Sequence, residues 1–572
     1  MNRNAEQHYN QVPRANVPRA RFKRDYSLLT TMNEGDLIPI YCDEVLPADT
    51  AKIDLNALMR MSTPLYPVMD NCYCDFYFFF VPSRLLWEHF ENLMGQNDST
   101  FWAEKVEYTT PKTTAPTGGW KVGTLADYFG IPTGVENLQV NSLPFRAYVK
   151  IWNEWFRDEN LQQPVTMSKT DATTAGSNAG TELTDAEAGG LPLKVCKYKD
   201  YFTSCLPTPQ KGDPVKINAS NGKVLPLLED GTPAYKYGPN TFAFGANNAW
   251  ENETTGSTTN QITAITSEGS GNANRYNDAS GNLAKVTLGV EMSAISINEL
   301  RQAIAVQHIL ERDARTGTRY KEILQGAWGV TSPDARLDRS EYIGGYRLPI
   351  NINQVIQTSS TDATSPQGNT AAFSMTTMSR NMATYSATEH GFIIGLAAVR
   401  VDHSYQQGLS RMWTRSTRFS YYDPMLANLG EQAVLNQEIY AQGNAQDEEV
   451  FGYQEAWADY RYRTNMITGE MRSTYAQTLD AWHYADKYKS LPTLSSDWIK
   501  EGTENIDRTI AVQSANSRQF ICTFYFDQTG TRAMPLPRIP GLDTISGGRS
   551  MSNGLMGIDK VGLTLASTLY SI

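Results

Sequence analysis

The sequence predicts a mainly β fold with helical insertions, and two observations support this. The 572 residues include 42 Gly, 27 Pro, 30 Tyr and 20 Phe, a composition that favours many short strands and long loops over helical bundles. Strand signals recur at widely spaced positions, residues 72–81, 348–356, 392–401 and 520–526. Strands so far apart in sequence can complete one sandwich only by long-range pairing, which is typical of a jelly roll with large loops.

Residues 71–95 carry the strongest local signal, NCYCDFYFFFVPSRLLWEHFENLMG. Residues 72–81 are almost continuously apolar and aromatic, which predicts a strand that is covered on both faces. Pro82 should end the strand, because proline cannot donate to a sheet ladder. Successive rings should point to opposite faces, since side chains alternate along a strand. One face would carry Phe76, Phe78 and Phe80, and the other Tyr77 and Phe79.

A short helix should follow this strand, with Ser83 as its N-cap and Gly95 after its last turn. Leu86, Phe90 and Leu93 would form its apolar face.

Two strands are expected before this stretch. Residues 37–46 predict an interrupted strand, with Pro39 near an edge or a bulge. Ala51, Ile53 and Leu55 alternate with polar residues, which indicates a half-buried strand.

Two helices are expected after it, one capped by Thr124 and a longer one capped by Ser142. The longer helix has a wide apolar stripe that is more typical of a core than of a ligand site. The stripe consists of Phe145, Tyr148, Val149, Trp152, Trp155 and Phe156.

The middle of the chain changes in composition. Residues 213–294 are rich in Gly, Asn, Ser and Thr, so they form either a disordered loop or a small β-rich insertion with partners of its own. Residues 296–299, SINE, match a capping box, and the helix that they open should end at Gly317.

Charge is distributed unevenly along the chain, whose net charge is −11. Residues 1–24 carry +5 and contain two prolines without apolar periodicity, which predicts a flexible basic arm. We expect this arm to contact nucleic-acid phosphates. Its basic residues are Arg3, Arg14, Arg19, Arg21, Lys23 and Arg24.

The cysteines do not predict a metal site. The six cysteines form no CxxC pair and the six histidines are scattered, so reduced, buried thiols are the expected state. No apolar run is long enough to span a bilayer, and the N-terminus lacks an apolar signal segment. These features favour a protein made and used in a cytosol, or in a particle assembled there, without insertion into a membrane.

Catalytic motifs are missing from the sequence, which has no nucleophile elbow, P-loop, GxGxxG or HExxH pattern. The acidic run Asp447, Glu448 and Glu449 does not define the separated carboxylates of a glycosidase, so we interpret it as a solvated or subunit-contact loop. His390 is an isolated histidine that is expected to pack or to bond locally. We therefore expect neither an enzyme nor a cofactor.

Arginines and aromatic residues interleave at residues 411–422. Arg411, Trp413, Arg415 and Arg418 could form a single-stranded DNA surface, because arginine binds phosphate and aromatic rings stack on unpaired bases. The same residue types are enriched at subunit interfaces, and we favour an interface.

Five stretches resemble the major capsid proteins of gokushoviruses, the small single-stranded-DNA phages of the Microviridae. They are FVPSRLLWEHFENLMGQND at residues 80–98, DYFTSCLPTPQKG at 200–212, RTGTRYKEILQGAWGVTSPDARLDRSEYIGG at 315–345, ATYSATEHGFIIGLAAVRVDHSYQQGLSRMWTRSTR at 383–418 and LANLGEQAVLNQEIYAQG at 426–443. The resemblance implies an eight-stranded viral jelly roll with long inter-strand loops. It also implies self-assembly into a T=1 icosahedral virion shell in the bacterial host cytoplasm.

The partners implied by this resemblance are identical copies of the chain, circular single-stranded DNA, a small basic DNA-packaging protein and a bacterial host-surface receptor. The expected organisation is a flexible basic N-terminal arm (1–24), a jelly-roll shell domain with helical insertions (25–212 and 295–543), a surface insertion or protrusion (213–294) and a Gly-rich C-terminal tail (544–572). The alternative is a secreted β-rich carbohydrate-binding protein or glycosidase, which the missing signal segment disfavours.

Overall fold

The computed structural model describes residues 19–96, 107–180, 183–212, 297–316, 338–356 and 370–534, four short strands between 224 and 290, and the single residues 325 and 358. The chain divides into two compact units, Met1–Pro209 with Thr318–Ile572, and Gln210–Gly317. The expected C-terminal tail lies outside the described residues.

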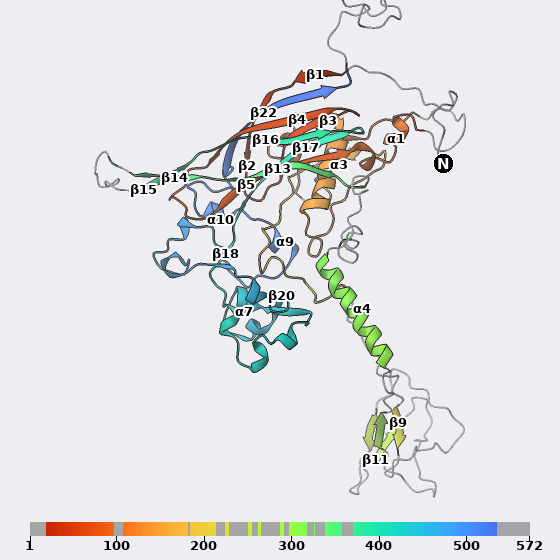
Figure 1. Ribbon diagram of the computed structural model, residues 1–572, viewed down its shortest axis with the longest axis vertical. Coiled ribbons are helices and arrows are strands. Elements are labelled where there is room, and N and C mark those ends of the chain that lie inside the picture. Colours follow the sequence, from red (N-terminus) through yellow and green to blue (C-terminus); the bar gives the residue numbers. More distant parts are fainter. Residues whose placement is uncertain are drawn as a thin grey trace, which may run out of the picture. The chain divides into compact units, whose positions relative to one another are not determined.

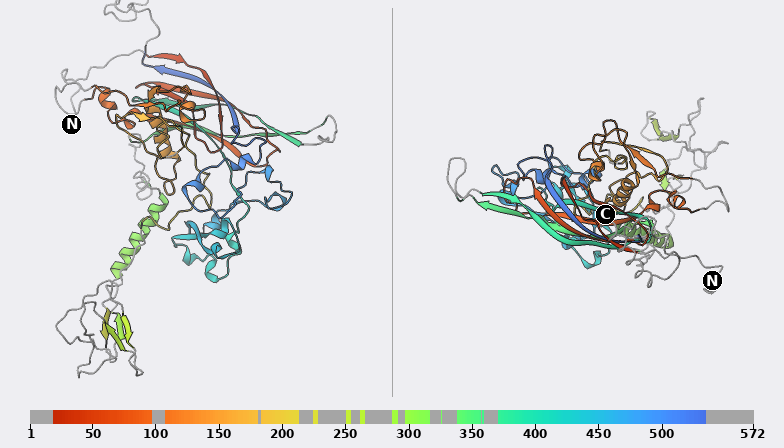
Figure 2. Two further views of the ribbon diagram at one scale, coloured as in Figure 1. Left: turned by 180° about the vertical axis from the view of Figure 1, so that it is seen from behind. Right: turned by 90° about the horizontal axis from the view of Figure 1, so that it is seen from above.

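Two antiparallel sheets dominate the first unit, and Figures 1 and 2 show their strands running alongside one another. Sheet A contains β1 (Ala20–Lys23), β2 (Tyr26–Met32), β4 (Thr50–Met61), β16 (Thr376–Ser386) and β22 (Phe520–Arg532). Sheet B has the order β13-β5-β17-β3, with β3 (Ile38–Val45), β5 (Cys72–Pro82), β13 (Glu341–Pro349) and β17 (Gly391–Val401).

The pairing order of these strands confirms the predicted jelly roll. Strands β2, β3, β4 and β5 pair with β22, β17, β16 and β13, which occur along the chain in the reverse order. Strand β4 also pairs with β22, and β5 also pairs with β17. These eight strands therefore form one long folded hairpin that supplies four strands to each sheet, and β1 adds a fifth strand to sheet A. Of the widely spaced strand signals of the sequence, residues 72–81 form the earlier strand of a pair, and residues 392–401 and 520–526 lie in the later strands β17 and β22.

Strand β5 places aromatic side chains on both faces of sheet B, as the sequence predicts. Phe76, Phe78 and Phe80 lie in the inner core between the two sheets. Phe79 is buried on the opposite face, where Tyr77 packs at the edge of a second, outer core. Gly395 stands opposite Phe78 in the register, and a Cβ at Gly395 would lie 2.6 Å from the Phe78 ring.

The outer core lies between sheet B and helix α3 (Leu143–Ile151) (Figure 1). The predicted apolar stripe packs here, except that Trp155, in the π-helical turn Trp152–Phe156, is exposed. Ser142 does not cap the helix as predicted, because its own backbone is already helical. Its hydroxyl donates to the Pro111 carbonyl, and Asn141 Oδ1 accepts from the Leu143 N–H instead.

The other local predictions had mixed outcomes. Thr124 caps α2 (Leu125–Tyr128) by accepting from the Asp127 N–H. Ser83 does not cap a continuous helix; a 3₁₀ turn at Ser83–Leu85 and α1 (Phe90–Leu93) replace the expected single helix. The expected strand at 348–356 is broken at residues 350–351, between β13 and β14 (Ile352–Ile356).

The first unit also carries short elements in its long loops. The strands are β6 (Lys112–Thr114), β7 (Gln139–Asn141), β8 (Thr174–Ala175), β15 (Thr370–Ser374), β18 (Ser404–Tyr405), β19 (Glu431–Leu435), β20 (Val450–Glu455) and β21 (Asn465–Met466). The helices are α7 (Asn436–Ile439), α8 (Ala458–Arg461), α9 (Ser496–Ile499) and α10 (Glu504–Asp507). A third, smaller core forms around Tyr201, Phe202 and Phe451.

The second unit contains helix α4 (Ile297–Thr316), which begins and ends where the sequence predicts. The short strands pair as β9 (Val224–Leu227) with β12 (Thr287–Val290), and β10 (Trp250–Glu253) with β11 (Gln261–Ala264). Contacts group α4 with this unit, although residues 295–316 were expected in the shell domain.

All six cysteines are free thiols, and only Cys42 is exposed. Among the described residues, no helix is long and apolar enough to cross a membrane.

The inner core yields a direct test at Phe78, which is fully buried. Truncating Phe78→Ala should lower the free energy of unfolding by about 3 to 5 kcal/mol, because it leaves a cavity between the sheets. Urea unfolding of the unassembled full-length chain measures this loss. Phe419→Ala is the matched control, since Phe419 is 75 % exposed and its truncation should change stability by less than about 0.5 kcal/mol. Equal losses in the two variants would contradict the assigned core.

Candidate functional site

The main candidate site is a set of exposed large apolar side chains on the loop between β18 and β19, which we call the aromatic patch. Three 3₁₀ turns shape the loop, Arg411–Trp413, Arg418–Ser420 and Pro424–Leu426. Short turns of this kind cannot bury their large side chains against each other. The patch consists of Leu409, Met412, Trp413, Phe419, Tyr421, Tyr422, Met425 and Leu429.

Two arginines of this loop point inward and support it. The Arg411 guanidinium donates to the Ala433 carbonyl at 2.5 Å and lies 3.8 Å from Glu438 Oε1. Arg415 pairs with Asp459, donates to the Ser420 carbonyl at 2.9 Å and stacks over the Tyr460 ring. Their carboxylate partners largely neutralise both charges, and the Arg415 side chain is only 8 % exposed.

The predicted site residues therefore divide into two groups. Arg411 and Arg415 serve the loop internally, while Trp413 (71 % exposed), Phe419 (75 % exposed) and Arg418 face solvent. Because carboxylates hold Arg411 and Arg415, Arg418 is the accessible cation among these three arginines, and the exposed apolar side chains outnumber it. Such a surface suits contact with another protein better than contact with a phosphate backbone. The geometry thus favours the interface interpretation over the DNA interpretation.

The basic arm differs from the prediction over its last residues. Ala20–Lys23 form β1, which pairs with the end of β22, because β22 extends past the predicted strand end and offers a free edge. Lys23 lies 2.7 Å from Asp25, and Arg24 lies 2.7 Å from Asp43. Arg19 and Arg21 are exposed, and Arg3 and Arg14 lie outside the described residues.

A buried ionic cluster was not anticipated from the sequence. His403 Nδ1 lies 2.8 Å from Asp486 Oδ1, and Nε2 lies 3.1 Å from Glu501 Oε1. Lys197 Nζ lies 3.2 Å from Asp486 Oδ2, and all four side chains are buried. The four residues come from four separate connections between elements, so the cluster ties together segments that are distant in sequence. We call it the His403 cluster.

The His403 cluster is electrostatically balanced. Burial acts to lower the pKa of His403, but the charges of Glu501 and Asp486 outweigh burial and raise that pKa well above its ordinary value. Burial acts to raise the pKa of Asp486, but His403 and Lys197 hold it well below the ordinary range. Glu34, close by, has its pKa raised by burial and by the charge of Glu501. His403 is therefore a cation held between carboxylates.

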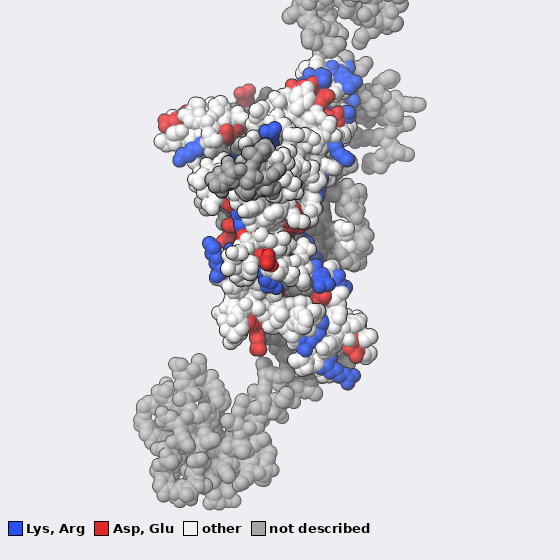
Figure 3. Space-filling view, turned by 90° about the vertical axis from the view of Figure 1, so that its left-hand side faces the viewer, with Lys and Arg blue, Asp and Glu red and all other residues white. Residues whose placement is uncertain are grey.

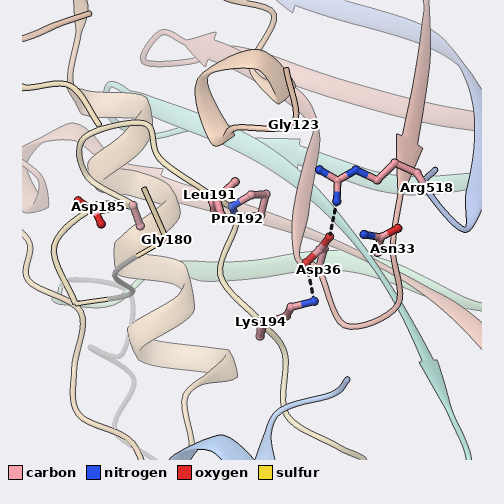
Figure 4. A pocket seen from close by; sticks show the side chains of 10 residues that line it. Asn33, Asp36, Gly123, Gly180, Asp185, Leu191, Pro192, Lys194 and Arg518 are labelled. Carbon is pink, nitrogen blue, oxygen red and sulfur yellow. Dashed lines mark ion pairs between the residues drawn. The ribbon is translucent and has the colours of Figure 1, made fainter. Parts of the chain in front are cut away.

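A polar pocket of about 290 Å³ lies where the β2–β3 connection meets residues 180–194 (Figure 4). Lys194 and Arg518 approach Asp36 from two sides, with Lys194 Nζ 2.8 Å and Arg518 Nη1 3.9 Å from its carboxylate. Because these charges face one another, we interpret the pocket as a structural junction.

The remaining candidates make local contacts. The His390 ring packs edge-on against Phe90, and the His390 carbonyl accepts from the Ser83 N–H. The Asp447 carboxylate accepts from the N–H groups of Gln442 and Gly443. Within the described ranges, no group of three or more His, Cys, Asp or Glu side chains could hold a metal ion. On the face seen in Figure 3, charged side chains of both signs are scattered among larger uncharged areas.

Comparison with known proteins gives consistent matches over nearly the whole chain. The family model described as capsid protein (F protein) matches residues 10–542. Capsid protein VP1 of Spiroplasma virus 4 is 42% identical over 92% of this chain and 96% of its own length. Capsid protein VP1 of Bdellovibrio phage phiMH2K is 39% identical over 94% and 98%, and that of Chlamydia phage 1 is 37% identical over 94% and 98%.

The His403 cluster predicts a pH-dependent loss of stability. Because folding raises the pKa of His403, its contribution is fully present below about pH 6.5 and is lost as pH rises through the raised folded pKa. His403→Asn should therefore lower the free energy of unfolding by about 3 to 5 kcal/mol near pH 6, because it leaves buried carboxylates uncompensated. The difference from wild type should shrink at alkaline pH, as measured by urea unfolding of the unassembled chain.

His308→Asn is the matched control for this experiment, since His308 is exposed on α4 and its loss should have little effect at any pH. A deficit in His403→Asn that is the same at every pH would contradict a charged His403.

Proposed function

This chain belongs to the capsid protein (F protein) family and is a major capsid protein of a microvirus, and from that premise we propose that its copies close into a T=1 icosahedral shell around circular single-stranded DNA. Its place is the virion, and its role is structural. The proposed mechanism is association alone, without a catalysed reaction. In such a shell, contacts around the threefold and fivefold axes are heterologous and close by rotation, whereas contacts across the twofold axes are isologous.

The aromatic patch is the observation that carries this proposal. It exposes Trp413, Phe419 and Met425 on one loop, a combination that is costly to leave in water and typical of interface hot spots. The inward ion pairs of Arg411 and Arg415 hold the loop in shape before contact, which lowers the entropy that association must offset. The occupant that we assign to the patch is a second copy of this chain.

The described arm residues support a smaller genome-contact surface than the sequence suggested. Lys23 and Arg24 are engaged by carboxylates, so we assign phosphate contact to Arg19 and Arg21 and to the residues that precede them. A small basic packaging protein would share this role.

The insertion at 213–294 is proposed to protrude from the shell and to contact a receptor on the host surface. Its four described strands pair with one another, and α4, which follows them, exposes Leu300, Ile304, Val306 and Ile309. These apolar side chains would be covered if copies of α4 met at a threefold axis. Exposed insertions of this kind tolerate variation, which suits host recognition.

The first prediction from this proposal concerns the aromatic patch. The double variant Trp413→Ala, Phe419→Ala should fold normally but fail to form stable shells, because hot-spot aromatics contribute about 2 kcal/mol or more each at every contact. Sedimentation and negative-stain microscopy measure assembly, and thermal unfolding of the free chain measures folding. Val122→Ala, which truncates another exposed apolar residue, should assemble normally. Wild-type shell yield from the double variant would contradict the assigned interface.

The second prediction concerns the arm. Neutralising Arg19→Gln and Arg21→Gln should weaken binding of single-stranded DNA to the full-length chain and make its salt dependence shallower by roughly 1.4, at about 0.7 per phosphate contact. The slope of log affinity against log salt measures this. Lys121→Gln with Lys489→Gln removes the same charge elsewhere and should leave the slope unchanged. Two identical slopes would remove the arm from the DNA contact.

The third prediction concerns the insertion. Replacing residues 215–290 with a Gly/Ser linker removes both strands of each pair together, and the shell unit should still fold and assemble. Adsorption of the particles to host cells should be lost. Microscopy measures assembly, and depletion of particles by cells measures adsorption. Particles that adsorb normally would remove the recognition role, and a chain that cannot fold would show the insertion to be framework.

A further inference from the structure

A second pocket, unrelated to the aromatic patch, lies on the outer face of sheet B beyond the end of α3. Its volume is about 520 Å³, which is within the range of small-molecule sites. Strands β5, β13 and β17 form its floor, and the π-helical turn Trp152–Phe156 with residues 196–199 forms its walls. We call it the Arg347 pocket.

One end of the Arg347 pocket is cationic. Asp75 lies there with Arg347 Nε at 2.8 Å and Arg400 Nη2 at 2.5 Å, and the Tyr198 hydroxyl donates to the same carboxylate at 2.7 Å. Both guanidinium groups also stack over the Tyr198 ring. One carboxylate therefore faces two guanidinium groups, and the Arg347 side chain is 52 % exposed. A cation remains available at the pocket mouth.

The other end of the pocket is aromatic. Phe79 lies 5.5 Å from both the Trp155 and the Tyr342 ring centroids, and Trp155 and Tyr342 are 6.2 Å apart. Trp155 and Tyr342 are among the exposed large side chains of the protein, although they border a buried core. The Arg339 guanidinium lies over the Trp155 ring, 4.2 Å from its centroid, and adds positive charge at that face of the ring. Planar rings with a nearby cation are the features that bind bases.

The distance between the cationic end and the aromatic end of the pocket fits several linked nucleotides better than a single nucleotide. Tyr342 and Arg347 are five residues apart on β13, which corresponds to roughly 15 Å along a strand. Tyr77 and Phe156 line the space between them, with ring centroids 5.1 Å apart. Aromatic surface is thus continuous from the Trp155 end to the Arg347 end.

We propose that the Arg347 pocket binds a short stretch of single-stranded DNA, with a base against Trp155 and Tyr342 and a backbone phosphate at Arg347. The DNA as ligand rests on the proposed function of enclosing a genome. A neutral saccharide fits less well, because the two carboxylates at the pocket, Asp75 and Asp158, are already held by Arg347 with Arg400 and by Lys199. The lining has five basic side chains, of which Lys197, Lys199 and Arg400 are engaged by carboxylates. Arg347 shares Asp75 with Arg400 and is 52 % exposed, so it is the cation that favours an anionic ligand.

The test is ultraviolet cross-linking of the full-length chain to a bromodeoxyuridine-containing oligonucleotide about ten nucleotides long, followed by mass spectrometry. Cross-links should map to peptides that contain Trp155 or Tyr342. Arg347→Gln should weaken binding by about tenfold, as expected for loss of a charge-assisted contact, and Arg347→Lys should retain part of it. Arg380→Gln is the matched control, because Arg380 is also exposed and stacks on a tyrosine, Tyr346, outside the pocket.

Several outcomes overturn the proposal. Cross-links that map elsewhere in wild type would do so even if Arg347→Gln failed to fold. If Arg347→Gln and Arg380→Gln bound the oligonucleotide with equal affinity, or if an abasic oligonucleotide bound wild type as tightly as the normal one, binding would be due to overall charge and not to this pocket. Competition by an acidic oligosaccharide but not by deoxythymidine monophosphate would assign it to a glycan. Shells of Arg347→Gln that form and hold DNA normally leave the capsid proposal intact, so the two proposals can fail separately.

Discussion

The burial of strand β5 on both faces is the constraint on which the rest of the first unit depends. β5 lies between β13 and β17, so neither its edges nor its faces meet solvent over most of their length. Phe78 fills the space between the two sheets, while Phe79 requires a second layer outside sheet B. A two-sheet sandwich alone would leave Phe79 exposed. Helix α3 and the loops around it cover that outer face and bury Phe79.

Those covering loops are long, and buried charge holds them in register. Lys197 lies in the long connection between β5 and β13. His403 directly follows β17, and Asp486 and Glu501 lie further along the connection between β17 and β22. An isolated ionic cluster of this kind contributes little net stability, but removing one partner is costly. The His403 cluster therefore favours one arrangement of the loops over others. A shell subunit needs that uniqueness, because each copy must present the same surface to its neighbours.

Much of the fold follows from local sequence patterns, whereas most of the site does not. The alternation of rings from Phe76 to Phe80 predicts both cores, because the period of a strand is fixed by its geometry. Caps are less reliable: Ser142 has the right residue type, yet Asn141 takes the role because the backbone is already helical at Ser142. The prediction of a flexible arm was wrong for residues 20–23, which form β1. No local pattern shows that β22 extends far enough to pair with these residues.

The site residues illustrate the limit of sequence reasoning more sharply. The interleaving of Arg411 and Arg415 with aromatic residues was compatible with a single-stranded DNA surface or a subunit interface. The ion pairs with Glu438 and Asp459, which only the fold reveals, distinguish these two interpretations. Each partner is more than twenty residues away and carries no recognisable motif. The His403 cluster and the Arg347 pocket join segments separated by up to several hundred residues, so no spacing in the sequence could have indicated them.

The division of the loop into inward arginines and outward rings leads to the central claim, that the aromatic patch is where copies of this chain meet. A cryo-electron-microscopy reconstruction of the assembled particle tests it most directly. The account predicts that Trp413 and Phe419 lose nearly all of their solvent exposure against a neighbouring copy. A closed particle in which both rings still face solvent would contradict it.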